Sequence, residues 1–217
     1  MSFIETIPDT EINDDVRTMY ERQQSFWGFV PNYARVFCYR PEIMGLWAQL
    51  QAGIKRTMDK RRFELVTFAA ANSLRSTLCS LAHGRALTQF FSKEDIQVMA
   101  RGASPASLTA AEAAMMAFAR KMARGAYMVL PADVEELKKH GFDDAEIFDI
   151  AATVGARAFW TSILEALGVE AEPSLRMMED DFKKALTVGR PIAANGNGDI
   201  PDFQGKGDRA QSARNGS

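Results

Sequence analysis

The sequence predicts an all-α protein, and three observations lead to that fold class. Ala, Leu, Met, Glu, Lys and Arg dominate the 217 residues, and these are strong helix formers. No segment alternates β-branched and polar residues as a strand does. Helix-capping residues and prolines recur at intervals that suit short helices. Since 47% of the residues are hydrophobic, a sizeable core can form, and we expect a single all-α domain over residues 1–187.

Caps and breaks divide the first half of the chain into short helices. Pro41 suits a first helical turn, because the N–H that proline lacks would have no partner there. Asp59 and Ser92 are capping residues that each precede a helical pattern. The segments expected to be helical are approximately residues 14–26, 32–39 and 41–57, a helix after Asp59 that carries Glu64, Phe68 and Ala71, a helix from Ser76 to about residue 90, and one from Ser92 to about residue 102.

The second half repeats this organisation. Thr109 and Glu112 have the spacing of a capping box, in which each side chain bonds the backbone N–H of the other residue. The segments expected to be helical are approximately residues 109–125, 131–139, 144–167 and 173–186. Residues 188–217 are rich in glycine and poor in large apolar residues, so we expect them to form a disordered C-terminal tail.

A weak internal echo suggests that the bundle is built from two related halves. Residues 64–70 (Glu-Leu-Val-Thr-Phe-Ala-Ala) resemble residues 146–152 (Glu-Ile-Phe-Asp-Ile-Ala-Ala). At the same offset Cys79 corresponds to Thr161, so the second copy lacks the chemistry of the first. Chance similarity between two alanine-rich helices explains the echo equally well.

Charge and apolar content argue against several classes of function. The net charge of −2 gives no electrostatic basis for binding nucleic acid. The chain does not start with a basic region and an apolar run, as a secretory signal does, and no segment reaches the roughly 20 apolar residues that span a bilayer. We therefore expect a cytoplasmic protein with no membrane contact. Cys38 and Cys79 are too few for a disulfide scaffold, and each is expected to be a free thiol.

Cys79 and His83 are the most chemically informative pair. They lie four residues apart, which places both on one face of a helix, about one turn apart. If Ser76 caps that helix, Cys79 lies in its first turn, where unpaired N–H groups and the helix dipole favour thiolate over thiol. Arg75 and Arg85 are further cations nearby. The chain has only two histidines, so a histidine at this spacing is informative.

Glu64 is the candidate carboxylate of the same site. It lies too far before Cys79 for contact along one helix, but adjacent antiparallel helices would bring the two together. There it would orient the imidazole of His83 and stabilise its charged form. In the alternative interpretation, Glu64 is a surface carboxylate paired with Arg61 or Arg62, within a solvated basic face that also includes Lys55, Arg56 and Lys60.

The same side chains also have a purely structural interpretation. A lone cysteine on an apolar helix is commonly a small buried hydrophobe, and burial favours its thiol form. The aromatic residues expected to be core or pocket lining are Tyr33, Tyr127, Trp47 and Trp160. One Cys, one His and one carboxylate fall short of a typical zinc set, and no glycine-rich loop suggests a phosphate site. Neither a metal nor a cofactor is expected.

Other segments accompany this constellation, and together they resemble a known superfamily. They are Trp27-Gly-Phe-Val-Pro-Asn32 with Pro41-Glu42, residues 64–87, and residues 108–168, which begin Leu-Thr-Ala-Ala-Glu. Over roughly residues 25–170 the chain resembles the carboxymuconolactone decarboxylase superfamily, and most closely its peroxidase-related, alkylhydroperoxidase D-like branch. The resemblance implies a helical bundle of two related halves and a homo-oligomer. Exposed apolar faces on helices such as residues 113–122 would agree with an oligomer.

The family motif is a glutamate, then Cys-x-x-Cys, then a histidine four residues after the second cysteine. Glu64, Cys79 and His83 match the glutamate, the second cysteine and the histidine. Ser76 stands where the first cysteine belongs, and Leu78 replaces a histidine that some members carry. The resemblance implies that Cys79 is the reactive cysteine and that its resolving cysteine is lost. The Ser76 hydroxyl could then hydrogen-bond the thiolate, and an external thiol would attack a sulfenic acid on Cys79.

Three functions follow as hypotheses. The first is a one-cysteine thiol peroxidase or related oxidoreductase that reduces hydroperoxides through Cys79, with His83 as base and an external thiol as reductant. Cys38 is the internal alternative to that thiol, although nothing in the sequence places it near Cys79. The second is cofactor-free acid–base catalysis on a small organic acid or lactone, in which Glu64 and His83 move protons and Cys79 is a bystander. The third is a non-catalytic oligomeric family member.

Overall fold

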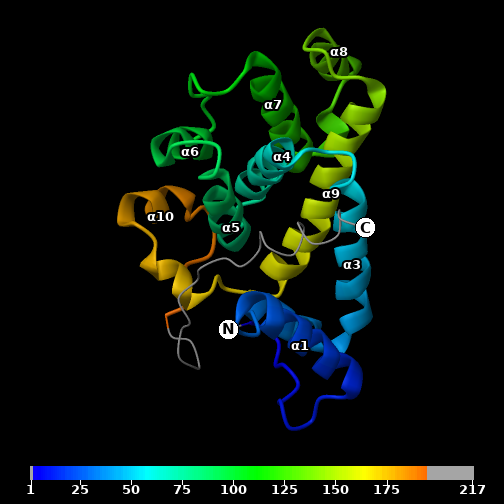
Figure 1. Cartoon of the computed structure of the whole chain (residues 1–217), viewed down its shortest axis with the longest axis vertical. Coiled ribbons are helices and arrows are strands. Elements are labelled where there is room, and N and C mark those ends of the chain that lie inside the picture. The colour runs from blue at the N-terminus through cyan, green and yellow to red at the C-terminus, as the bar shows by residue number, and fades with distance from the viewer. Residues whose placement is uncertain (1, 195–217) are drawn as a thin grey trace, which may run out of the picture.

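The computed structural model describes residues 2–194, and within them the protein is all-α, as predicted (Figure 1). The elements in chain order are α1 (Asp14–Trp27), α2 (Asn32–Val36), the 3-10 helix η1 (Phe37–Tyr39), α3 (Pro41–Ile54), α4 (Lys60–Ser73), α5 (Thr77–Leu87), α6 (Lys93–Ala100), α7 (Ala110–Arg124), η2 (Ala126–Met128), α8 (Pro131–Lys139), α9 (Asp144–Ala166), η3 (Pro173–Met177) and α10 (Asp180–Leu186). The β structure among these residues is an isolated bridge between Ala171 and Ile192.

Side-chain caps begin most of the longer helices at the residues that the sequence indicates. Asp59 and Ser92 accept hydrogen bonds from backbone N–H groups in the first turns of α4 and α6. Thr109 and Glu112 form the predicted capping box at the start of α7. Asp143 begins α9 with a second capping box. Local side-chain chemistry therefore determines where these helices start.

The C-terminal helix differs from the prediction. The sequence pattern predicts one helix over residues 173–186, but the chain forms the short 3-10 helix η3 and then α10. Met178 and Glu179 between them have extended backbones. Leu175 is buried from η3, and Phe182 and Leu186 are buried from α10. The break lets both short segments bury their apolar side chains against the body.

Helix α4 lies at the centre of the bundle and packs against α5, α7 and α9 (Figure 1). Its residues from Phe63 through Ala71 are all buried, so the helix is covered on every side. The apolar residues from Phe63 to Ala70 form one hydrophobic core with residues of α5, α7 and α9. The Ala- and Met-rich segment 113–122 belongs to that core, because Met115, Met116 and Ala119 are buried there. It does not supply the exposed apolar face that the sequence suggested.

A second hydrophobic cluster joins the N-terminal helices to the C-terminal half of α9. Side chains of α1, α2 and α3 pack around Trp160 and Leu164 of α9. Ala71 at the end of α4 and Cys79 at the start of α5 belong to this second cluster. Cys79 therefore lies where the N-terminal helices meet the central bundle.

Residues 188–194 pack against the body of the protein. The Gly189 N–H donates to the Thr77 hydroxyl at 2.9 Å, beside the start of α5. The buried Ala193 donates its N–H to the Ala171 carbonyl oxygen at 3.0 Å. The packed chain thus extends beyond residue 187, where the sequence pattern places the start of a tail, and residues 195–217 of that predicted tail lie outside the described residues.

Helix α9 is long and apolar enough, by length and composition, to cross a membrane, and it is alone in this among residues 2–194. Half of its most apolar window is buried inside the protein. It packs against α3, α4 and α7, as the core helix of a bundle does.

Candidate active site

A tight reversal between α4 and α5 positions the predicted site residues. Arg75 adopts a left-handed conformation, with φ of 57°, and the Ser76 N–H donates to the Ala71 carbonyl at 3.0 Å. The chain then turns back, so α5 packs along α4. This arrangement brings Glu64 of α4 beside His83 of α5, as the antiparallel pairing predicts.

Glu64 and His83 form a close buried pair. The His83 Nδ1 lies 2.6 Å from the Glu64 Oε2. Burial raises the pKa of Glu64, but the facing His83, Lys55 and Arg157 outweigh it, so the net pKa is lowered. The carboxylate is therefore ionised at neutral pH, and it accepts a hydrogen bond from Nδ1. Glu64 is not a surface carboxylate, and its partner is neither Arg61 nor Arg62.

Burial favours the neutral form of the His83 imidazole, because it lowers the pKa of the ring. Burial is the largest cause that lowers the pKa of His83, and Arg157 and Lys55 lower it further. Glu64 raises it, but the net effect is a lowered pKa. The sequence suggested that Glu64 stabilises the charged form, but the neighbouring cations and burial prevail. With the proton on Nδ1, the free lone pair is on Nε2. His83 lines the same pocket as Cys79, so it can serve as a base there.

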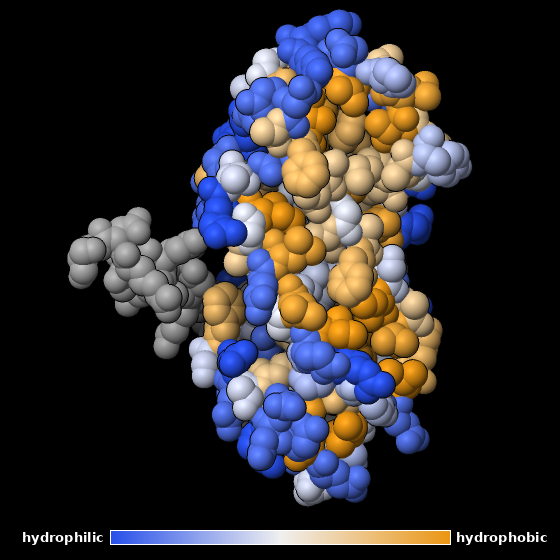
Figure 2. All heavy atoms as spheres, turned by 90° about the vertical axis from the view of Figure 1, so that its right-hand side faces the viewer, coloured by the Kyte–Doolittle hydropathy of each residue, from blue (hydrophilic) through white to orange (hydrophobic). Residues whose placement is uncertain are grey.

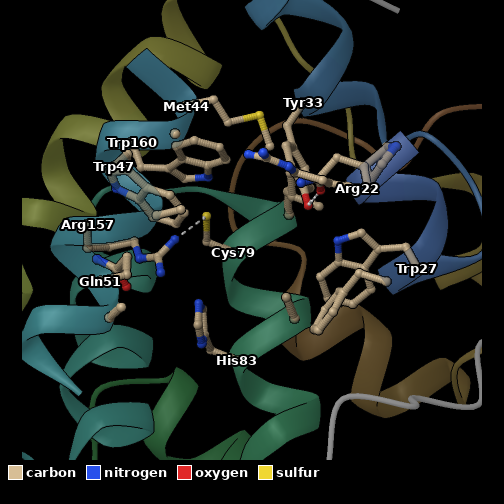
Figure 3. A pocket seen from close by; sticks show the side chains of 18 of the residues that line it. Arg22, Trp27, Tyr33, Met44, Trp47, Gln51, Cys79, His83, Arg157 and Trp160 are labelled. Atoms are coloured by element: carbon tan, nitrogen blue, oxygen red, sulfur yellow. Dashed lines mark hydrogen bonds between the residues drawn. The ribbon is translucent and has the colours of Figure 1, made fainter. Parts of the chain in front are cut away.

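The Cys79 sulfur lies beside a cation from a distant helix. The residue Cys79 is only 3% exposed, and it lines the pocket shown in Figure 3. Arg157 Nη1 donates to Sγ at 3.5 Å, and the Thr161 hydroxyl donates at 3.8 Å. A guanidinium in hydrogen-bond contact favours the thiolate form. His83 is not among the hydrogen-bond partners of this sulfur, so a proton passes between them only through a water molecule or substrate in the pocket.

Arg157 is the functional residue that sequence reasoning missed. It is 4% exposed, its Nε has no hydrogen-bond partner, and its guanidinium lies 5.7 Å from the centre of the Trp47 ring. No carboxylate forms an ion pair with it within residues 2–194. Its signal in the sequence is its isolation, since it is the one charged residue between Asp149 and Glu165. The sequence suggested Arg75 and Arg85 as the cations near the Cys79 sulfur. Arg75 is exposed, and Arg85 lines the pocket without a hydrogen bond to that sulfur.

Ser76 occupies the predicted N-cap position but does not act as predicted. Its backbone is extended, yet its hydroxyl makes no capping hydrogen bond. The hydroxyl is buried without a partner of good geometry, and it faces Glu165 rather than Cys79. The structure therefore shows no hydrogen bond from Ser76 to the Cys79 sulfur. Thr161 supplies the hydroxyl instead, at the position that the internal echo pairs with Cys79.

The two segments of the echo lie on helices that pack against each other, α4 and α9. These helices contain residues 64–70 and 146–152, and they contact each other in the core. The two segments continue differently, because the chain breaks between α4 and α5, whereas α9 runs unbroken to Ala166. The break is what places Cys79 in the first turn of a helix.

The pocket is large, and aromatic side chains form part of its wall. Its volume is about 1240 Å³, above the range of a typical small-molecule site. Trp47 and Trp160 stack at 3.9 Å between ring centres, and Tyr33 meets Trp160 edge-on at 5.3 Å. Figure 3 shows Trp47 and Arg157 on one side of Cys79, and Tyr33 and Trp27 on the other. The sequence prediction of core or pocket lining holds for these wall residues but not for Tyr127, which is exposed and outside the pocket.

Two further ionisable residues line the pocket. Lys55 lies at its rim with its ammonium 4.6 Å from the Phe63 ring, and burial lowers its pKa. Lys55 is exposed, which agrees with the solvated face that the sequence suggested. Glu172 is buried and accepts a hydrogen bond from the Asn32 N–H at 2.5 Å. Burial raises the pKa of Glu172 to about 7. Glu172 can therefore exchange a proton near neutral pH.

Cys38 is a second buried free thiol on a different element. It lies in η1, within the same hydrophobic cluster as Cys79. Its sulfur accepts a hydrogen bond from the Ile7 N–H at 3.4 Å, and it does not line the pocket. Within residues 2–194, no three His, Cys, Asp or Glu side chains gather closely enough to hold a metal ion.

Several solved protein structures superpose on this chain over most of their length. A peroxidase-related protein from Ralstonia eutropha, described as an alkylhydroperoxidase D core, superposes with a TM-score of 0.65 at 23% identity, over 87% of this chain and 98% of that one. A peroxidase-related protein from Silicibacter gives a TM-score of 0.67 at 22% identity, over 81% and 94%. The chain has an alkylhydroperoxidase D-like fold. The fold predicted from the Glu64, Cys79 and His83 motif is thus confirmed.

Another structural neighbour is named for a different activity. The debrominase Bmp8, in complex with 2,3,4-tribromopyrrole, superposes with a TM-score of 0.66 at 13% identity, over 82% of this chain and 95% of that one. No family model matches the sequence. No curated protein matches it either. The fold therefore accommodates more than one activity.

Proposed function

We propose that this protein is a one-cysteine thiol oxidoreductase that reduces hydroperoxides through Cys79, with an external thiol as reductant. The observation that carries the proposal is the buried Arg157 donating to the Cys79 sulfur, in one pocket with the His83–Glu64 pair. The sulfur, a cation that stabilises its anion, and a neutral imidazole base share one pocket.

The charges around the pocket agree with a thiolate. Arg157 brings a buried positive charge to the pocket, and Glu64 is the buried carboxylate that faces it. Arg157 makes no ion pair within residues 2–194, so its charge has no counterion in direct contact. A buried charge without a counterion is costly, and ionising Cys79 supplies the missing negative charge.

The reaction sequence balances with these groups. His83 takes the thiol proton through a pocket water, and the Cys79 thiolate attacks the terminal peroxide oxygen. The S–O bond forms as the O–O bond breaks, and the alkoxide leaves with the proton from His83, so a sulfenic acid and an alcohol result. An external thiol displaces water from the sulfenic acid, and a second one releases Cys79 as a disulfide of the reductant forms.

The test is intact-protein mass spectrometry after dilute peroxide. We expect one oxygen atom to be added to Cys79 and to be lost on addition of a dithiol. Cys79→Ser should abolish both changes, whereas the matched variant Cys38→Ser should keep them, because Cys38 does not line the pocket. Unmodified Cys79 under conditions that oxidise a small-molecule thiol would rule out the peroxidase proposal.

The size of the pocket bears on the substrate. Hydrogen peroxide fills a small part of about 1240 Å³, whereas an organic hydroperoxide with an aromatic ring would contact Trp27 and the Trp47–Trp160 wall. We expect cumene hydroperoxide to react faster than hydrogen peroxide. Because a neighbour of the same fold binds 2,3,4-tribromopyrrole, that compound with a thiol belongs in the same panel of substrates.

A second candidate function is acid–base catalysis on a small organic acid or lactone. It is favoured by the geometry of the His83–Glu64 pair, which is complete without any hydrogen bond to Cys79. This function predicts that Cys79→Ser keeps activity and His83→Gln loses it. Loss of activity in both variants would favour the thiol mechanism.

A further inference from the structure

Gln51 is a buried polar residue that the proposed reaction does not use. It is only 8% exposed, and it lines the pocket that contains Cys79. Within residues 2–194, its side-chain amide makes no hydrogen bond. An amide carries two N–H donors and an oxygen acceptor, and buried groups of this kind are nearly always bonded. The amide of Gln51 is therefore available to a ligand in the pocket.

The polarity of α3 is reversed at this residue. A helix at a protein surface ordinarily turns polar residues outward and apolar residues inward. Figure 2 shows the side of the molecule on which α3 and α9 lie, and apolar side chains cover much of it. The large apolar residues that these two helices expose are Ile43, Leu46, Leu50, Phe148 and Phe159. Gln51 is polar and lies inward, so hydration does not explain its place, whereas a role inside the pocket does.

Helical spacing fixes where the amide lies. Trp47, Gln51 and Lys55 follow one another at intervals of four, so they share one face of the helix. That face is held against α9, because Trp47 stacks on Trp160 at 3.9 Å between ring centres and its Nε1 donates to the Ala156 carbonyl at 3.3 Å. Gln51 is thus the middle residue of a stripe that borders the pocket.

Arg157 of α9 lies close to the same stripe. Its guanidinium is 5.7 Å from the centre of the Trp47 ring, and, after burial, its charge is a cause that lowers the pKa of Lys55. Gln51 lies between those two residues along α3. Figure 3 shows Gln51 and Arg157 on the same side of Cys79. The amide therefore borders the space in which the sulfur meets a substrate.

The neighbouring charges favour one orientation of the amide. The side chains of Arg157 and Lys55 can only donate hydrogen bonds, and their positive charges attract the amide oxygen of Gln51. The NH2 group is then the end that is left for the pocket. The ligand atom that fits it is an oxygen that accepts a hydrogen bond, and an oxygen with negative charge fits best.

The proposed reaction creates such an oxygen. When the Cys79 thiolate attacks the terminal peroxide oxygen, the electron pair of the O–O bond moves to the leaving oxygen, which then takes the proton from His83. This oxygen lies beyond the attacked atom, so its donor cannot be a group that bonds the sulfur. Gln51 makes no hydrogen bond to the sulfur, whereas Arg157 does. A donor fixed at an oxygen whose charge grows stabilises the transition state more than the bound peroxide.

We propose that Gln51 is a catalytic residue whose side-chain NH2 group donates a hydrogen bond to the leaving oxygen of the hydroperoxide. The inference rests on the peroxidase function proposed above, and it adds the group that stabilises the departing anion. Gln51 keeps both of its own protons, so the balance of the reaction is unchanged. Arg157 stabilises the attacking sulfur and Gln51 the departing oxygen, so substrates with a poor leaving group depend on Gln51 most.

The experiment compares two small oxidants that differ in their leaving group. tert-Butyl hydroperoxide releases a strongly basic alkoxide, whereas peracetic acid releases acetate, which is stable without a donor. The rate of oxygen addition to Cys79 is measured with each oxidant by quenched-flow mass spectrometry of the full chain. Gln51→Met keeps the length of the side chain and removes the amide. It should slow the reaction with tert-butyl hydroperoxide by about 10- to 100-fold and leave the reaction with peracetic acid nearly unchanged.

Matched controls separate this role from others. Gln97→Met is the same substitution in α6, outside the pocket, and should react with both oxidants as wild type does. Alkylation of Cys79 by iodoacetamide should keep its wild-type rate in Gln51→Met, because it needs the thiolate but releases iodide, a poor hydrogen-bond acceptor. The melting temperature of Gln51→Met should not fall, since the change removes an unbonded buried amide. Gln51→Leu removes the amide with a different shape and should show the same selective loss.

Two results would overturn the role of Gln51 alone. The first is a Gln51→Met variant that reacts with tert-butyl hydroperoxide at the wild-type rate, because the amide would then make no contact with the leaving oxygen. The second is an equal loss with both oxidants or in alkylation, which would assign Gln51 to the thiolate or to the fold. A wild-type Cys79 that neither oxidant modifies would instead overturn the peroxidase function, and the role of Gln51 with it.

Discussion

Replacing Arg157 with methionine tests the central electrostatic contact of the site. The guanidinium donates to the Cys79 sulfur at 3.5 Å, and its Nε has no partner. Arg157→Met keeps most of the buried volume and removes the positive charge. The thiolate then loses its cationic donor, while the His83–Glu64 pair remains.

The size of the effect follows from the energy of that hydrogen bond. A hydrogen bond to a charged group contributes about 1.5–3 kcal/mol, and about 1.4 kcal/mol changes an equilibrium tenfold. Removing it should reduce the stabilisation of negative charge on the sulfur by a factor of roughly 10 to 150. A less stabilised thiolate is a stronger nucleophile, which offsets about half of this change on a logarithmic scale. The alkylation rate at neutral pH should therefore fall by about 3- to 12-fold.

The assay is the rate of iodoacetamide labelling of Cys79, followed by peptide mass spectrometry. Cys38 is the internal reference, because its sulfur is buried away from the pocket and labels faster only if the fold loosens. Arg157→Lys keeps the charge without the planar guanidinium and should fall between wild type and methionine. If Arg157→Met labels Cys79 at the wild-type rate while Cys38 is unchanged, the electrostatic argument is wrong.

Further predictions concern pH and packing. The pKa of the Glu172 carboxyl is raised from 4.5 to about 7, so the folded protein loses stability as pH rises from 4.5 through 7. The side chain of Glu172→Gln cannot ionise and still accepts the Asn32 hydrogen bond. In urea unfolding, this variant should raise the unfolding free energy by up to about 3 kcal/mol above pH 7 and by little near pH 4.5. Because the pKa of His83 is lowered, chiefly by burial, the base stays neutral below the usual histidine range, and the acidic limb of the peroxidase pH profile should lie below pH 6.5. A Cβ at Gly84 would lie 2.0 Å from the buried Leu186 side chain, so Gly84→Ala should destabilise the fold by about 1–3 kcal/mol in thermal unfolding; an unchanged melting temperature would contradict this packing.

The starts of most helices could be read from the sequence because they depend on local chemistry. Asp59, Ser92 and Thr109 cap the helices that follow them, since each side chain bonds a backbone N–H only a few residues away. Ser76 is the exception. It stands at the N-cap position, but tertiary packing turns its hydroxyl away from the helix end and from Cys79.

The Glu64–His83 pair could be predicted because helical spacing and one antiparallel turn suffice to bring the two residues together. The state of the imidazole could not. It depends on how deeply His83 is buried and on two cations, Lys55 at the end of α3 and Arg157 in α9. Neither quantity has a signature in the residues next to His83.

The sequence alone determined the helical class and the starts of most helices, because these follow from contacts within a turn or two of the chain. Helical spacing and one antiparallel turn also sufficed to predict three members of the site. The tertiary structure decided that Arg157, 78 residues from Cys79, supplies the cation at the sulfur. It also decided that Lys55 and Glu172 border the pocket and that α3 and α9 share an exposed apolar face. Electrostatic and packing energies depend on distances in space, and only the folded chain sets those distances between residues far apart in sequence.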